Sequence, residues 1–403
     1  MSWIKNIGPA TMVTAAFIGP GTIITASLAG ASFGYALTWA LVFSILATIV
    51  LQEMTGRLAV VRQMNLAYAL RTEYHHPLIK TGASLLVFLA IWLGNGAYQS
   101  GNLLGAAIGL QQLAGQTDVP VHYFVWGTAM AVFILLFIGK YQVVEKVLIG
   151  LVALMSMVFL VTIFFLSLDF TALLKGLVPS LPSGSTFMAI GLIGTTIVPY
   201  NLFMHSATVS AKWSGADKLP LVRRDVFISI SIGGIISLCV LLTAASTLFL
   251  SGVKAQGLAE LGEQLRPLLG DFATGFLSCG VFAAGLTSSI TAPLAAGYAI
   301  AGLWKNELPD LRSGWFRGAW MSILASGLVI ASLGIRPLFV IQVAQFTNGL
   351  LLPILAVFLL VIMNSKKMGE NRNGILSNVL GILIVMIVAG LGLKSIVTSL
   401  GLL

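Results

Sequence analysis

The chain has 403 residues, of which 58% are apolar and 9% charged, and its mean hydropathy is +0.99. This composition excludes the soluble globular classes and is typical of a polytopic membrane protein. The net charge of +9 comes mostly from Lys and Arg at the ends of apolar segments and in loops that would share one side of the membrane. Such a bias sets orientation by the positive-inside rule and indicates no nucleic-acid partner.

Apolar windows of about 20 residues predict an all-α protein with about eleven transmembrane helices. Their approximate ranges are 9–34, 36–60, 80–112, 121–139, 143–167, 186–210, 226–250, 270–303, 316–335, 338–362 and 374–397. The polar segment 62–80 is interpreted as a solvated loop. The charge pattern predicts a multi-pass protein of the cell membrane with a cytoplasmic N-terminus, and an odd number of spans then places the C-terminus outside.

Two of these spans carry a proline-containing break, at residues 19–22 and 198–201. Proline removes a backbone donor and glycine weakens a helix, so we expect unwound backbone there, with second half-helices beginning at about Thr22 and Tyr200. Unwound backbone at bilayer depth must line a cavity, because its polar groups would otherwise stay unsatisfied. A simple proline kink is the alternative for either break alone, but a matched pair favours a transporter.

The spans also predict an internal repeat over a single transporter domain, residues 1–403. Spans one to five (9–167) and six to ten (186–362) each open with a break, and an odd number of helices makes the two repeats inverted in the membrane. The span at 374–397 lies outside this pairing. This arrangement is typical of secondary transporters that work by alternating access.

The residues expected to line the cavity are neutral. Asn95, Gln99 and Asn102 share one side of the third span, and Gln345 lies on a polar stripe of the tenth. The predicted substrate-binding set is Gly19, Pro20, Gly21, Thr22, Gln99, Thr195, Thr196, Val198, Tyr200, Asn201 and Gln345. The candidates for coupling to a proton or to sodium are Asn102, His205, Thr287, Ser288 and Ser289.

Each coupling candidate has a structural alternative. His205 is either a proton acceptor or a hydrogen-bonded structural histidine. The hydroxyls at 287–289 either bond to their own helix or help to hold sodium. No catalytic constellation appears, so we expect neither an enzyme nor a cofactor.

The distribution of charge bears on the substrate. None of the 13 acidic residues falls near the middle of a span, so no metal site built on side-chain charge is expected. The second half-helix at each break also presents free N–H groups with a partial positive charge of roughly half a unit. Together these features favour a small anion, with bicarbonate or a small carboxylate as candidates.

Four segments resemble the natural resistance-associated macrophage protein (Nramp) family of proton-coupled divalent metal transporters: 19–22, 28–35, 198–206 and 285–291. The resemblance implies an amino-acid/sodium symporter-like fold with substrate between broken helices 1 and 6.

The metal-binding and proton-path residues of the family differ here. The family's Asp-Pro-Gly-Asn motif supplies two metal ligands, Asp and Asn, and this chain has Gly19 and Thr22 at those positions. The Met and His of the family's Met-Pro-His motif are replaced here by Val198 and Tyr200. Its acidic pair on helix 3 aligns with Gln99 and Asn102.

Three hypotheses follow from the sequence. The first is a secondary transporter of a small anion, which binds to Thr22, Tyr200 and the half-helix amides. The second keeps the activity of the family, so that a partly hydrated manganese, magnesium or iron ion is held by carbonyls and amides. The third is a membrane sensor or partner subunit that transports nothing.

Overall fold

The computed structural model describes residues 8–10, 18–74, 76–116, 118–139, 142–303 and 313–399, and every regular element within them is a helix. The α-helices are α2 (Pro20–Phe33), α3 (Thr38–Arg62), α4 (Leu66–Glu73), α5 (Pro77–Leu113), α6 (Val121–Ile138), α7 (Gln142–Thr162), α8 (Phe170–Gly176), α9 (Thr186–Thr196), α10 (Pro199–Lys212), α11 (Leu219–Ala244), α12 (Leu258–Gly262), α13 (Arg266–Leu269), α14 (Ala273–Gly302), α15 (Gly314–Ala331), α16 (Pro337–Asn364) and α17 (Ile375–Ser399). Short 3₁₀ or π turns are η2 (Ile163–Phe165), η3 (Ala216–Lys218), η4 (Ala245–Phe249), η5 (Glu263–Leu265), η6 (Gly270–Phe272) and η7 (Lys366–Asn371).

Within the described residues, 10 helical segments are long and apolar enough to cross a membrane. They correspond to the predicted spans from the second to the eleventh. In the predicted first span, 9–34, the part that follows the break forms helix α2, which has 14 residues. The part of that span at 11–17 lies outside the described residues.

Each predicted break is followed by a helix that begins with proline. Helix α9 ends at Thr196, and α10 begins at Pro199 after a Val198 N-cap in extended conformation. Helix α2 begins at Pro20 after Gly19, which is also extended. The half-helices therefore start slightly earlier than the predicted Thr22 and Tyr200. Proline suits the first helical position because its φ is already helical and no donor is needed there.

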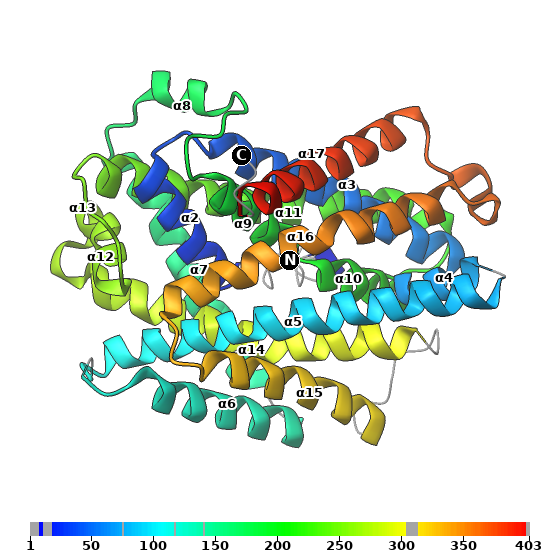
Figure 1. Cartoon of the computed structure of the whole chain (residues 1–403), viewed down its shortest axis with the longest axis horizontal. Helices are drawn as coiled ribbons and strands as arrows, with labels where there is room; N and C mark the ends of the chain where they lie inside the picture. The colour runs from blue at the N-terminus through cyan, green and yellow to red at the C-terminus, as the bar shows by residue number, and fades with distance from the viewer. Residues whose placement is uncertain are drawn as a thin grey trace, which may run out of the picture.

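Helices α2, α9 and α10 occupy the centre of the molecule, and α5 runs alongside α14 (Figure 1). Glycines permit this close packing. A Cβ on Gly109 of α5 would lie 2.7 Å from the backbone nitrogen of Phe282 on α14. A Cβ on Gly105, one turn earlier, would collide with Pro20. Small residues let membrane helices approach in this way, and they bring α5 against the first break.

The prediction of a solvated loop at 62–80 is wrong in part, because this segment contains helix α4. The Asn65 side chain caps the helix by accepting a 2.9 Å hydrogen bond from the Tyr68 N–H. Leu66 and Leu70 are buried against the rest of the protein. A helix of eight residues is too short to be found by a window chosen to detect membrane spans. The short helices α8, α12 and α13, in other connecting segments, were not predicted for the same reason.

Candidate functional site

A hydrogen bond joins the first break to the helix that precedes the second. The hydroxyl oxygens of Thr22 on α2 and Thr195 on α9 are 2.8 Å apart, and both residues are buried. One turn earlier on α9 and one turn later on α2, a Cβ on Gly191 would lie 3.5 Å from the methyl group of Thr25. The predicted members Thr22 and Thr195 therefore come together directly, and they join α2 to α9.

Helices α5 and α14 approach the breaks through Tyr98 and Ser288. The ring of Tyr98 packs edge-on against Tyr200, with 5.5 Å between the ring centroids. A Cβ on Gly19 would lie 2.9 Å from the Ser288 hydroxyl and 3.2 Å from the Tyr98 hydroxyl. The missing side chain at Gly19 therefore leaves room for both hydroxyls beside the first break.

Gln345 of α16 approaches the first break from another direction. A Cβ on Gly21 would collide with the side-chain amide of Gln345. The backbone of α16 is equally close to α9, because a Cβ on Gly194 would collide with the Gln345 carbonyl oxygen. Gln345 is thus held between the two interrupted helices, as its place in the predicted set requires.

The side chains predicted around the breaks carry many buried polar atoms without a hydrogen-bond partner. They are Gln99 Oε1, both amide atoms of Asn102, Asn201 and Gln345, and the hydroxyls of Tyr200, Ser288 and Ser289. These residues are at most 1% exposed. An unsatisfied buried polar group costs about 1–3 kcal/mol, so such a concentration is expected only where a ligand or ordered water completes the bonds. Most of the atoms are oxygens.

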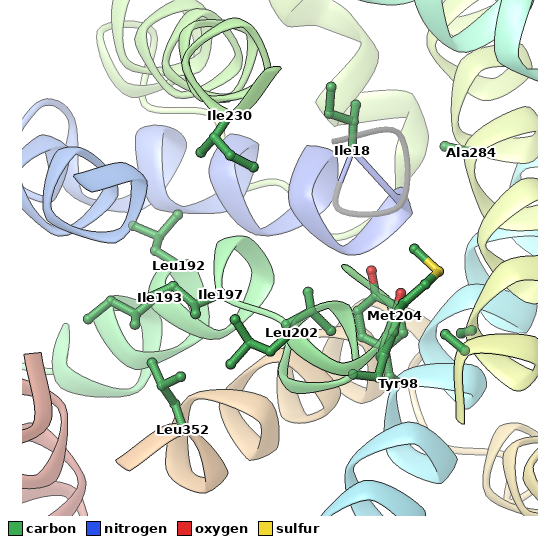
Figure 2. Close-up of a cluster of buried hydrophobic side chains, with 14 of the residues drawn as sticks. Ile18, Tyr98, Leu192, Ile193, Ile197, Leu202, Met204, Ile230, Ala284 and Leu352 are labelled. Atoms are coloured by element: carbon green, nitrogen blue, oxygen red, sulfur yellow. The ribbon is translucent and has the colours of Figure 1, made fainter. Parts of the chain in front are cut away.

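An apolar layer backs this polar region. Figure 2 shows Leu192 and Ile193 on α9, Ile197 directly after it, Leu202 beyond the second break on α10 and Leu352 on α16. All five are at most 1% exposed. Such packing keeps water from the unpartnered atoms and strengthens any electrostatic contact made among them.

Three predicted residues use their polar groups elsewhere. The Thr196 hydroxyl donates to the Leu192 carbonyl at 3.0 Å, and the Thr287 hydroxyl donates to the Ala283 carbonyl at 2.7 Å, each within its own helix. His205 lies beyond the second break, where its Nδ1 is 3.1 Å from the Thr55 hydroxyl of α3. Its Nε2 is buried without a partner.

Sequence reasoning omitted Tyr98 from the binding set, although the structure places it against Tyr200 and beside Gly19. The signal was present, since Tyr98 lies one helical turn before Asn102 and therefore on the same face of α5.

No three His, Cys, Asp or Glu side chains come together as a metal-binding group in the part of the chain that the structure describes.

Two interrupted helices that meet over buried polar atoms, within a bundle of membrane-spanning helices, define a transporter. The family model described as natural resistance-associated macrophage protein-like matches residues 10–398, and the chain belongs to this family. It is a multi-pass membrane transporter and not an enzyme.

Named relatives cover nearly all of the chain. The divalent metal cation transporter MntH of Klebsiella pneumoniae (strain 342) is 30% identical over an alignment of 404 positions, which covers 98% of this chain and 94% of the relative. The divalent metal cation transporter MntH of Yersinia pestis (strain Pestoides F) is 28% identical over 401 residues, with 96% and 93% covered.

Solved structures share the fold. A mutant of the Eremococcus coleocola manganese transporter superposes with a TM-score of 0.77 at 23% identity, covering 98% of this chain and 87% of the other. The nucleobase-cation-symport-1 transporter Mhp1, closed around bromovinylhydantoin, superposes with a TM-score of 0.62 at 13% identity, covering 98% and 93%. These likenesses confirm the predicted symporter-like fold with broken helices 1 and 6.

The prediction of a small-anion substrate is wrong. The relatives that match nearly the whole chain are named divalent metal cation transporters. The structure also removes several of the donors on which the prediction relied, since each second half-helix begins with a proline, which has no N–H. The N–H groups of Thr22 and Ile23 bond to the Gly19 carbonyl at 3.2 and 3.3 Å, and that of Asn201 bonds to the Val198 carbonyl at 3.0 Å.

Proposed function

We propose that this protein transports a divalent metal cation, with manganese and magnesium as the favoured ions, by alternating access at the two breaks. One observation carries the proposal: buried oxygen atoms without partners are concentrated where the interrupted helices meet. The names of the relatives that match nearly the whole chain also support it.

The chemistry of these oxygens favours hard cations. Carbonyl and water oxygens suit magnesium and manganese, whereas sulfur and imidazole favour later transition metals. Val198 and Tyr200 offer neither sulfur nor imidazole beside the second break. Because amides and hydroxyls carry no net charge, we expect the ion to keep part of its hydration shell.

In this proposal Asn201 and Gln345 supply amide oxygens, and the Tyr200 and Ser288 hydroxyls complete the ligand set. Gln99 is left out of the ligand set, because its Cβ and Cγ pack against Gly327 of α15. The hydrogen bond between Thr22 and Thr195 holds the two halves together around the ion. Gly19, Pro20, Gly21 and Val198 form the walls of the same site.

The layout of the chain and its coupling belong to the proposal as well. We take the repeats as residues 9–167 and 186–362, with a cytoplasmic N-terminus and an outer C-terminus. His205 is the candidate carrier for a coupled proton, because its free Nε2 is buried in α10.

Reconstitution into liposomes that contain a metal-sensitive dye tests the proposed activity. We expect saturable uptake of Mn²⁺ and of Mg²⁺, with weaker uptake of Cu²⁺ and Zn²⁺ because the site offers only oxygen ligands. Protein-free liposomes are the control. A dye response no larger than that of protein-free liposomes, for all four metals, would refute the proposal.

A further inference from the structure

Two cavities follow one another along a groove formed by α5, α14 and their neighbours. The first has a volume of about 160 Å³ and is lined by Arg71, Lys80, Thr81, Ser84 and Leu303. The second has a volume of about 220 Å³. Neither cavity includes a residue of the predicted transport site, so the groove needs an explanation of its own.

The two cavities lie on the same face of α5. Lys80 and Ser84 line the first, and Phe88 and Trp92 line the second, at a constant spacing of four residues. Residues four apart on a helix lie one above the other. On α14, Ile300 of the second cavity precedes Leu303 of the first by about one turn. The groove therefore runs along both helices, from a polar end near the start of α5 to an apolar end.

The polar end has the chemistry of a phosphate site. The guanidinium of Arg71 and the ammonium of Lys80 bring two positive charges to this cavity, and Thr81 and Ser84, which also line it, carry hydroxyls. Arg71 is held at the cavity because its Nη1 donates to the Leu303 carbonyl at 2.9 Å. The Ser84 hydroxyl is buried without a partner. Arginine and lysine with hydroxyl donors are the groups that bind phosphate oxygens.

The apolar end has the shape and chemistry of a site for a hydrocarbon chain. Trp92 donates its indole N–H to the Ser322 hydroxyl at 3.2 Å, so its ring is available as an apolar wall. A Cβ on Gly318 would meet no atom within 4 Å, which shows that the space beside α15 is open. Leu78 and Leu85, on the α5 segment that borders the groove, are 78% and 55% exposed, as residues that face lipid are.

We propose that this groove binds an anionic glycerophospholipid, with the phosphate at Arg71 and Lys80 and an acyl chain beside Phe88, Trp92 and Gly318. A basic cavity is followed by an apolar one along helices that cross the membrane. A phospholipid has the same order, with its charged headgroup followed by its acyl chains. A soluble anion would use only the first cavity. The lipid would contact both α5 and α14, the helices that carry Tyr98 and Ser288 to the transport site.

Native mass spectrometry of the full-length protein in detergent tests the proposal with added phosphatidylglycerol and, separately, phosphatidylcholine. We expect one phosphatidylglycerol to bind with a clear preference over phosphatidylcholine. Lys80→Gln should weaken that binding about fivefold, the effect of one basic residue at a membrane surface. Gly318→Leu should weaken it about tenfold, because the new side chain takes the place of about two methylenes of the acyl chain.

Matched variants outside the groove provide controls. Lys146→Gln removes an exposed lysine of α7, and Gly127→Leu fills open space beside an exposed glycine of α6, so both should bind the lipid as the wild type does. Equal binding of the two lipids, or equal binding by Lys80→Gln, Gly318→Leu and wild type, would overturn the proposal. Displacement of the lipid by millimolar inorganic phosphate in both wild type and Gly318→Leu would overturn it too, since it would assign the basic cavity to a soluble anion.

Discussion

Replacing Asn201 with leucine is expected to lower the affinity for transported manganese about 10–100-fold, the effect seen when the polar groups around a bound metal are removed. Asn201 is 1% exposed, belongs to the first turn after the second break, and has both side-chain amide atoms without a partner. Leucine is similar in shape to asparagine but offers no oxygen. Initial rates of dye-reported uptake over a range of manganese concentrations give the KM that checks this.

Two further variants decide how that result is interpreted. Asn201→Asp keeps an oxygen at the same place and adds charge, so its KM should be no higher than that of the wild type. Thr208→Val, further along α10, removes only a hydroxyl that bonds to carbonyls of its own helix, and it should leave the KM unchanged. An Asn201→Leu protein with the KM of the wild type would show that Asn201 is not a ligand.

Gly194→Ala is expected to destabilise the protein by about 1–3 kcal/mol, the usual effect of adding a methyl group to a fully packed interior. The new Cβ would collide with the carbonyl oxygen of Gln345 and the amide nitrogen of Gly349, which are backbone atoms of α16 and cannot rotate away. The collision separates α9 from α16 at the level of the transport site. Thermal unfolding in detergent should therefore show a lower Tm, and uptake should fall as well.

Gly191→Ala is the matched control on the same helix. Its Cβ would make an ordinary contact of 3.5 Å with the methyl group of Thr25. Since alanine is the better helix former by about 0.5–1 kcal/mol, this variant should unfold at or above the temperature of the wild type. If the two alanine variants had the same Tm, the packing of α9 on α16 would be looser than the structure indicates.

The long elements of the fold could be predicted from the sequence because each depends on one local property. A membrane helix needs about 20 apolar residues, and Pro20 and Pro199 each stand at the first position of a helix. Proline alone is not a sufficient signal, because α14 and α16 continue through Pro293 and Pro353. Helix α4 was not predicted from the sequence, because its burial depends on tertiary contacts. Leu66 is held in part by its N–H, which donates to the Ser206 hydroxyl of α10 at 2.9 Å, a contact that no sequence window reveals.

Which residues gather around the breaks could be predicted better than the charge of the ion that they bind. Thr22, Thr195, Tyr200, Ser288 and Gln345 do meet around the breaks, because polar residues in apolar spans turn toward one another. The sign of the substrate's charge was predicted wrongly. Backbone N–H groups at the breaks were taken as free donors, although several of them already bond to nearby carbonyls. Which N–H groups are already bonded depends on φ and ψ at the break, and that information comes only from the structure.

Anomalous scattering from crystals grown with manganese tests the central claim most directly. The account predicts a peak between the two breaks, with the side-chain oxygens of Asn201 and Gln345 or a bound water within about 2.0–2.6 Å, the range in which oxygen binds divalent cations. The absence of a peak there at manganese concentrations that saturate uptake would contradict it.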